Sequence, residues 1–161
     1  MSALDRLREL GFELPALAPR HEFMSVNVIG DLAFISGHAP FRQGEFQYNG
    51  KVGRDLDARA GREAAELALL GCLASLQDCL GTLERVQRVV KMNGYVNCDP
   101  GFRDLPAITD AASTILGSIF GERGRHARTT VGVNSLPQGV AVEIELIVQV
   151  NADGAGCPAE D

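Results

Sequence analysis

Hydrophobic positions alternate most regularly in two runs near the C-terminus, Arg128–Asn134 and Val140–Val150. In both runs, β-branched and other hydrophobic side chains recur at every second position, which is the period of a half-buried β-strand. The segment between them, Ser135–Gly139, contains a proline, which fixes φ, and a glycine, which tolerates positive φ. The pattern therefore predicts two strands joined as a β-hairpin.

The register of such a hairpin decides which polar side chains meet. If the apolar faces coincide, the strands can slip only in steps of two residues, and Arg128 and Thr130 then share a face with Glu143 and Glu145. Arg128 would lie within reach of a cross-strand ion pair. Periodicity alone favours an exposed ion pair that stabilises little. The alternative is an anion-binding arginine, because a guanidinium holds a planar carboxylate through two parallel hydrogen bonds.

The rest of the chain combines short β-type runs with two long amphipathic helices. Apolar residues recur at helical spacing in Asp55–Leu80 and Phe102–Phe120, and Val86–Val96 between them is typical of a strand. We expect the order βββ-α-β-α-ββ, an α+β fold with two helices packed on one face of a mixed β-sheet. The leading elements are a short helix and three strands, predicted at Ser2–Leu10, Phe23–Ile29, Leu32–Ser36 and Glu45–Tyr48.

The length of 161 residues suits one domain with a sizeable core. We expect an N-terminal helical extension and linker at 1–20, the domain at 21–150 and a flexible tail at 151–161. Leu32–Ile35 is wholly apolar, as in a strand that is covered on both faces. Another subunit is therefore expected to cover the sheet face opposite the helices.

Composition and charge narrow the classes of function. The formal net charge of −6 argues against nonspecific nucleic-acid binding, which requires clustered Lys and Arg. All apolar runs are too short to span a bilayer, and the N-terminus lacks the pattern of a signal peptide. We therefore expect a cytoplasmic protein that does not act in a membrane.

The four cysteines, Cys72, Cys79, Cys98 and Cys157, form no CxxC pair and have no histidine at metal-ligand spacing. Free thiols in a reducing compartment are favoured over disulfides or a zinc site. His38 is interpreted as a hydrogen-bonded structural residue, with ligand contact as the alternative. His126 lies two residues before Arg128, so in a strand it would share the face of Arg128.

Two segments resemble a known family. The run HARTTVGVNSLPQGVAVEIE, from His126 to Glu145, resembles the C-terminal signature of the RidA/YjgF family, and Leu32–His38 resembles the family strand that ends in Ser-Gly. The resemblance covers roughly Phe23 to Val150. The Gly-Arg-His-Ala-Arg sequence that ends at Arg128 is similar to a divergent branch called endoribonuclease L-PSP-like.

This resemblance implies a homotrimer of subunits with the chorismate-mutase-like/YjgF fold, with active sites in clefts between subunits. The implied activity is hydrolysis of small enamine or imine intermediates bearing a carboxylate to 2-keto acids and ammonia, with no metal or organic cofactor. Arg128 matches the residue that binds the substrate carboxylate, Glu143 matches the glutamate that positions water, and Ser36 matches the serine of the Ser-Gly strand end.

Three positions differ from the family pattern. Phe23 stands where the family has a tyrosine, Asp110 falls near a family asparagine, and Thr130 replaces a cysteine. Three functions therefore remain open: a deaminase of this type, a protein that binds keto acids without turnover, and, with less support from the sequence, an endoribonuclease.

Overall fold

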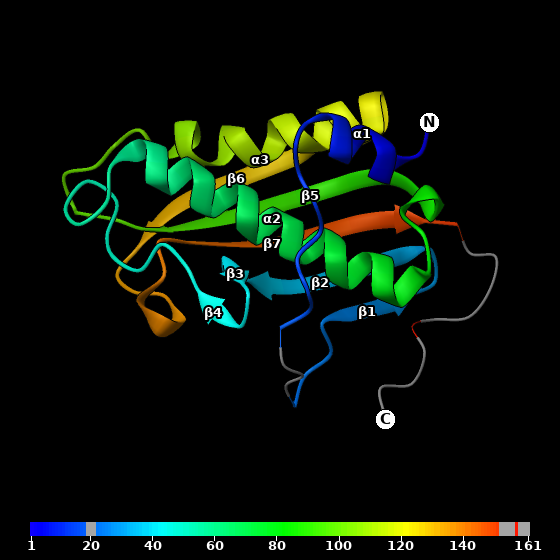
Figure 1. Ribbon diagram of the computed structural model, residues 1–161, viewed down its shortest axis with the longest axis horizontal. Coiled ribbons are helices and arrows are strands. Elements are labelled where there is room, and N and C mark those ends of the chain that lie inside the picture. Colours follow the sequence, from blue (N-terminus) through cyan, green and yellow to red (C-terminus); the bar gives the residue numbers. More distant parts are fainter. Residues whose placement is uncertain (19–21, 152–156, 158–161) are drawn as a thin grey trace.

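A five-stranded mixed β-sheet forms the centre of the molecule (Figure 1), in the strand order β1-β2-β7-β5-β6. The structure is a computed structural model that describes residues 1–18, 22–151 and 157. Only β5 and β6 run parallel, and the other neighbouring strands pair antiparallel. The strands are β1 Val26–Ile29, β2 Leu32–His38, β5 Val86–Asn97, β6 Ala127–Val133 and β7 Val142–Val150.

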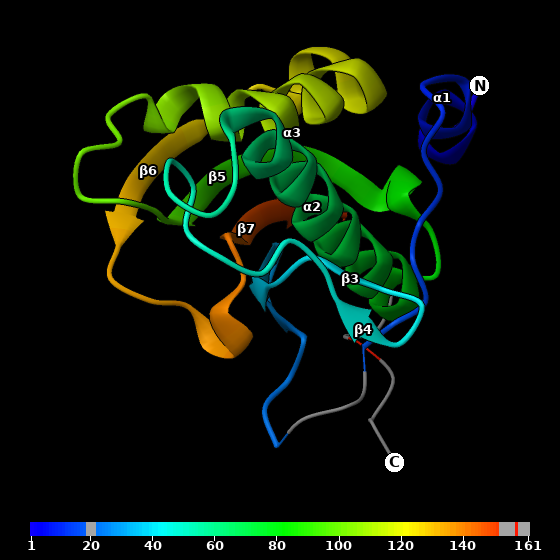
Figure 2. The ribbon, with the colours of Figure 1, turned by 60° about the vertical axis from the view of Figure 1, so that its left-hand side comes forward.

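Both long helices pack on one face of this sheet, α2 at Ala58–Leu80 and α3 at Leu105–Phe120 (Figure 2). The Asp57 side chain caps the N-terminus of α2 by accepting from the Ala60 backbone N–H at 2.8 Å, and Gly81 ends the helix with φ of 77°. The alternate residues of β7 that face these helices are apolar and buried. The predicted α+β fold with two helices on one sheet face is confirmed.

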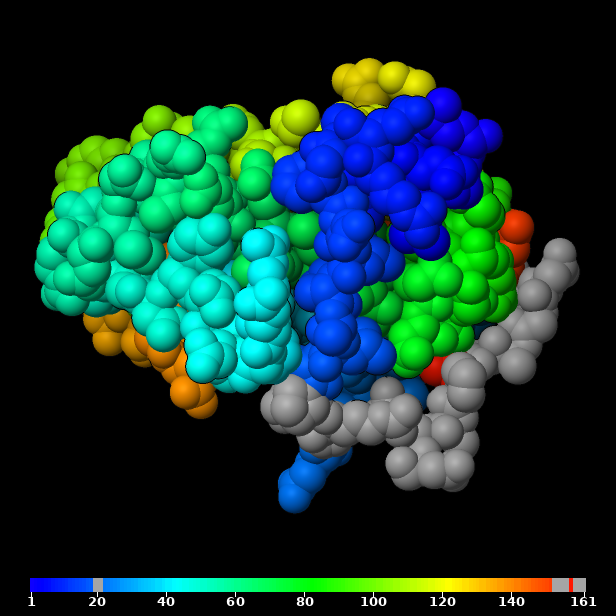
Figure 3. Space-filling view, in the orientation of Figure 1, coloured from blue at the N-terminus to red at the C-terminus, as the bar shows by residue number. Residues whose placement is uncertain are grey.

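The N-terminal segment forms the predicted short helix, α1 at Ala3–Glu9. A capping box between Ser2 and Asp5 starts it, and Leu7 is buried. Arg6 Nε donates to the Ile119 carbonyl at 2.6 Å, which ties α1 to the end of α3. The segment then crosses the helical side of the molecule (Figure 3).

The third predicted strand is a small hairpin outside the main sheet. It consists of β3 Phe41–Arg42 and β4 Glu45–Phe46, and the rings of Phe41 and Phe46 pack edge to face with centroids 5.2 Å apart. Short 3-10 turns complete the chain: η1 Leu83–Arg85, η2 Gly121–Gly124 and η3 Pro137–Gly139.

The predicted hairpin between the last two strands is wrong, because β5 lies between β6 and β7. The turn-like segment around η3 crosses to the other side of β5 and is held by distant backbone: Gly50 N–H donates to Gly139 O at 2.8 Å, and Ala141 N–H donates to Tyr48 O at 2.9 Å. These long-range bonds determine where the chain goes after β6.

The strand order also separates residues that were predicted to share a face. Met92 of β5 pairs with Arg128 of β6 on one side and with Leu146 of β7 on the other. Since paired residues share a sheet face, Arg128 lies on the face that the helices cover. Glu143 and Glu145 alternate with the buried residues of β7 and lie on the opposite face.

No helix or strand among the described residues covers this opposite face, which we call the open face. It is defined by alternate residues of four strands: Phe34, Lys91, Asn93, Tyr95, Thr129, Val131, Glu143, Glu145 and Ile147. Phe34 is 39% exposed there, so the expected cover for this apolar strand does not come from the described part of the chain.

The expectation of four free thiols is wrong for one pair. Cys79, near the end of α2, and Cys157 form a disulfide, with their Cα atoms 4.4 Å apart. Cys157 comes back to the domain beside β1, where its sulfur lies 3.4 Å from the Val26 carbonyl oxygen. Sequence spacing does not reveal such a return. Cys72 and Cys98 are free.

Most of the predicted flexible tail, 151–161, lies outside the described residues, as does part of the predicted linker. The described helices include none with the length and apolar character needed to cross a membrane.

Candidate functional site

Arg128 occupies the edge of the sheet, where β6 meets α3. Its Nη1 donates to Asp110 Oδ1 at 2.7 Å and to Ser113 Oγ at 3.1 Å. Asp110 and Ser113 are almost one helical turn apart on α3, so both side chains reach the same guanidinium nitrogen. This arrangement fixes one end of the guanidinium against the helix.

The contacts of Arg128 leave one edge of its guanidinium available. Within the described part of the chain, Nε and Nη2 have no hydrogen-bond partner, and the side chain is 23% exposed. These two nitrogens form the side-on fork that binds both oxygens of a carboxylate. Arg128 can therefore keep its contacts with α3 and still hold an anion.

His126 and Thr130 lie on the same side of β6 as Arg128. His126 Nε2 is 3.1 Å from Ser113 Oγ, and its Nδ1 is 2.7 Å from the Gly124 carbonyl oxygen. The prediction that His126 shares the face of Arg128 is confirmed. The Thr130 hydroxyl is 2.7 Å from the hydroxyl of Thr109, which is fully buried in α3, so Thr130 links the strand to the helix.

Glu143 lies on the open face, beside Gly37. A Cβ at Gly37 would overlap the Glu143 carboxylate, so only glycine allows this approach. No hydrogen-bond donor among the described residues satisfies that carboxylate. Burial, and secondly the charge of Glu145, raise the pKa of Glu143 above its ordinary value. Glu143 is thus an acidic group prepared to take or release a proton nearer to neutral pH.

Glu145, two residues further along β7, has partners on the neighbouring strand. Its Oε1 accepts from Asn93 Nδ2 at 2.7 Å and from the Tyr95 hydroxyl at 2.8 Å. The hydrogen bond to Glu145, together with burial, raises the pKa of Tyr95. The bonds from Asn93 and Tyr95 hold the Glu145 carboxylate in place, two residues from Glu143 on the same strand.

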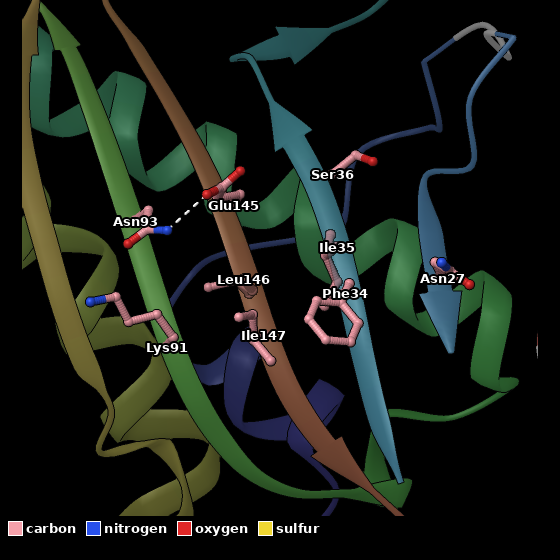
Figure 4. Close-up of a pocket in the computed structure, with 9 residues that line it drawn as sticks. All are labelled: Asn27, Phe34, Ile35, Ser36, Lys91, Asn93, Glu145, Leu146 and Ile147. Atoms are coloured by element: carbon pink, nitrogen blue, oxygen red, sulfur yellow. Dashed lines mark hydrogen bonds between the residues drawn. The ribbon is translucent and has the colours of Figure 1, made fainter. Parts of the chain in front are cut away.

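A hollow of about 260 Å³ extends along the open face between β5, β7 and β2 (Figure 4). Lys91 borders it and donates from Nζ to Thr129 Oγ1 at 2.8 Å. The hollow combines an apolar floor with polar groups, as ligand sites do. It is lined by Asn27, Phe34, Ile35, Ser36, Lys91, Asn93, Glu145, Leu146 and Ile147.

The remaining sequence-predicted residues lie near this hollow or at the surface. Ser36 lines it, but its hydroxyl donates to the Met24 carbonyl at 2.7 Å. Phe23 is 55% exposed just before β1. His38 points the other way, toward α2, with Nε2 2.8 Å from Ser75 Oγ and Nδ1 2.7 Å from Ser36 O. These bonds support the structural interpretation of His38.

The predicted site residues therefore form two groups on opposite faces of the sheet. Arg128, Asp110 and Thr130 meet at the edge beneath α3, whereas Glu143 and Ser36 lie on the open-face side. A single chain does not bring Arg128 and Glu143 together. No cluster of His, Cys, Asp or Glu suited to a metal ion occurs among the residues that the structure describes.

Sequence reasoning missed several of the residues around these groups. Lys91, Asn93 and Tyr95 alternate with apolar residues in β5, and this period-two signal could have placed them on one face. No sequence signal identifies Ser113 as a partner of Arg128, because that contact depends on how α3 lies over β6.

The mixed sheet with both long helices on one face is the α+β arrangement of the chorismate-mutase-like fold. The family described as "YjgF/chorismate mutase-like, putative endoribonuclease" matches residues 4–148. The chain belongs to this family, which confirms the resemblance found in the sequence.

Individual relatives agree with this assignment. Protein TCP17 of Trypanosoma cruzi is 39% identical over 147 residues, which are 90% of this chain and 92% of that protein. The crystal structure of Atu1372 from Agrobacterium tumefaciens, a protein of unknown function, is 38% identical with a TM-score of 0.87, covering 92% of this chain and 93% of that one. A protein from Shewanella oneidensis MR-1 is 29% identical with a TM-score of 0.90, covering 93% and 100%.

Proposed function

We propose that this protein hydrolyses small enamine or imine intermediates that bear a carboxylate, giving 2-keto acids and ammonia. The observation that carries this proposal is the Nε/Nη2 edge of Arg128, which has no partner in the described residues while Nη1 is held by Asp110 and Ser113. A guanidinium fixed in this way is oriented to receive a planar carboxylate at its open edge.

Glu143 supplies the acid-base chemistry in this proposal. Water adds to the carbon of the protonated imine and gives one proton to Glu143, which leaves a carbinolamine. Glu143 returns this proton to the nitrogen before the C–N bond breaks. The hydroxyl proton then leaves through Glu143 as the carbonyl of the 2-keto acid forms, and ammonia is released. The raised pKa of Glu143, caused first by burial, suits a group that must accept and donate a proton in one cycle. An enamine enters the same route after tautomerising to the imine.

The two groups come from different subunits. Arg128 and Glu143 lie on opposite faces of one sheet, so a shared ligand must contact the Arg128 edge of one subunit and the open face of the next. Head-to-tail contacts close into a ring when the rotation between neighbouring subunits allows it, and we propose a homotrimer with three equivalent sites. The open face, with Phe34 39% exposed, is the surface that such an assembly would cover.

The test is a coupled assay in which a threonine dehydratase generates the imine and keto-acid release is followed in the presence of semicarbazide. The wild-type protein should accelerate release, and Arg128→Ala should remove the acceleration. Arg125→Ala is the matched control, because the Arg125 side chain is 77% exposed and, among the described residues, forms an ion pair only with Glu122, at 3.5 Å. Equal acceleration by wild type and Arg128→Ala would exclude this function.

A second candidate is binding of a 2-keto acid without turnover. It is favoured by Phe23, which has no hydroxyl, and by Ser36, whose hydroxyl is already donated to Met24 O. A thermal-shift screen of keto acids separates the two functions, since a shift that depends on Arg128 without any imine hydrolysis supports binding alone.

The family description also names endoribonuclease action. The net charge of −6 gives it little electrostatic support, and His38 and His126 both have their ring nitrogens within hydrogen-bond distance of protein partners. Cleavage of RNA by the wild type, with loss of cleavage in Arg128→Ala and Glu143→Gln, would favour this function instead.

A further inference from the structure

We propose that Asp110 makes the Arg128 site selective for ligands that carry a positively charged nitrogen next to their carboxylate, namely protonated 2-imino acids and α-amino acids, over 2-keto acids. This inference rests on the proposed function, in which Arg128 holds the carboxylate. It adds a residue that distinguishes the substrate from the product.

The selectivity rests on the Arg128–Asp110 ion pair, in which each side chain keeps atoms available for a ligand. Asp110 uses Oδ1 to accept from Arg128 Nη1 at 2.7 Å, and within the described part of the chain Oδ2 has no partner. The Asp110 side chain is 57% exposed and that of Arg128 is 23% exposed. A ligand bound at the Nε/Nη2 edge of Arg128 therefore lies beside a carboxylate that can still accept a hydrogen bond.

The charges of Arg128 and Asp110 favour ligands with no net charge over anionic ligands. The Arg128–Asp110 pair carries no net charge, so a 2-keto acid brings an uncompensated negative charge close to Asp110. A protonated imino acid or an α-amino acid has no net charge and can direct its N–H groups to Oδ2. Because Asp110 is more than half exposed, solvent screens the effect, and we expect a preference of about two- to fivefold.

The surroundings keep Asp110 next to Arg128. Ser113 Oγ accepts a second hydrogen bond from the same Nη1 at 3.1 Å, and His126 Nε2 lies 3.1 Å from Ser113 Oγ. The guanidinium is thus held from two positions on α3 and cannot turn away from Asp110 without losing both bonds. Asp110→Asn would keep an acceptor for Nη1, but it would remove the charge and replace the accepting Oδ2 with an NH2 donor.

The selectivity also affects product inhibition. Hydrolysis converts a ligand with a charged nitrogen into an anionic keto acid, so Asp110 weakens binding of the product relative to the substrate. The wild-type enzyme should show weak product inhibition, and Asp110→Asn should show inhibition that is about two- to fivefold stronger relative to its substrate affinity.

The direct test compares two probes of equal size, L-alanine and pyruvate, by NMR titration or isothermal titration calorimetry. The wild type should bind L-alanine about two- to fivefold more tightly than pyruvate. Asp110→Asn should equalise or invert this ratio. Asp104→Asn is the matched control, because Asp104 is exposed at the start of the same helix and makes no capping bond. A ratio of affinities is insensitive to a general loss of folded protein.

The outcomes separate this inference from the function it rests on. If both probes bind through Arg128, as shown by loss in Arg128→Ala, but Asp110→Asn leaves their ratio unchanged, the selectivity is wrong and the proposed function stands. Tighter binding of pyruvate by the wild type also overturns the selectivity. If both probes still bind to Arg128→Ala, or neither binds to the wild type, carboxylate anchoring by Arg128 fails and the selectivity fails with it.

Discussion

Two acidic residues of the candidate site, Asp110 and Glu143, lie in different surroundings. Asp110 pairs with Arg128 at 2.7 Å, and its side chain is 57% exposed. Glu143 is partly withdrawn from solvent and has a like charge, Glu145, nearby, and these surroundings raise its pKa. We therefore propose ligand recognition for Asp110 and proton exchange for Glu143.

The raised pKa of Glu143 predicts a specific dependence of stability on pH. Between the ordinary glutamate pKa of about 4.5 and the raised value, the folded state binds more protons than the unfolded state. The free energy of unfolding should therefore fall as pH rises through this window. Glu143→Gln should remove this contribution, as measured by urea denaturation at a series of pH values above 4.5. Glu122→Gln, at an exposed glutamate, is the control and should keep the pH profile of the wild type. A Glu143→Gln profile identical to that of the wild type would contradict a raised pKa of Glu143.

At the scale of elements, the position of β5 between β6 and β7 determines the chemistry of each face. Period-two alternation was sufficient to predict the last two strands, β6 and β7, because burial of one face imposes it on a half-covered strand. It could not predict their neighbours. The Pro-Gly segment before β7 has the composition of a hairpin turn and makes local turn bonds, yet Gly139 and Ala141 also bond to Gly50 and Tyr48, far away in sequence. The faces of Arg128 and Glu143 follow from those distant contacts.

The junction between α3 and β6 allows a test by paired glycine substitutions. At Gly124 an added Cβ would meet the backbone carbonyl of Leu116, which cannot move without distorting α3. Gly124→Ala should therefore lower the free energy of unfolding by about 1–3 kcal/mol. Gly117, within α3, has open space at its Cβ position, and Gly117→Ala should raise the free energy by about 0.5–1 kcal/mol.

Denaturant unfolding of both variants against the wild type checks this pair. Because η2 leads directly into His126 and Arg128, Gly124→Ala should also reduce the hydrolysis of imines, whereas Gly117→Ala should retain it. Destabilisation by Gly117→Ala that equals that of Gly124→Ala would show that the close approach of η2 to α3 is not the cause.

At the scale of the whole molecule, each subunit contributes to two different sites in the proposed homotrimer. Its Arg128 edge faces one neighbour and its Glu143 face serves the other, because the two groups lie on opposite sides of the sheet. Interfaces of this head-to-tail kind contain two different surfaces, and each site needs one surface from each partner.

Mixing two inactive variants tests this arrangement. Arg128→Ala and Glu143→Gln should each be inactive alone. After they are unfolded, mixed in equal amounts and refolded, about one quarter of the sites should receive an intact Arg128 from one subunit and an intact Glu143 from the next, by random assembly of a trimer. The measurement is keto-acid release per subunit, with each variant refolded alone as the control. A mixture that stays inactive, although it elutes as a trimer, would show that Arg128 and Glu143 do not form a shared site between neighbouring subunits.

The central position of β7 has a consequence for how the protein is made. β7 joins the N-terminal pair β1–β2 to β5, although it is the last of the five strands to leave the ribosome. Until then, the β1–β2 hairpin has no neighbouring strand, and a two-stranded hairpin is marginally stable in water. The sheet therefore closes only after synthesis reaches Val150, and a nascent chain that stalls before Val142 exposes two unpaired strand edges to chaperones and to other chains.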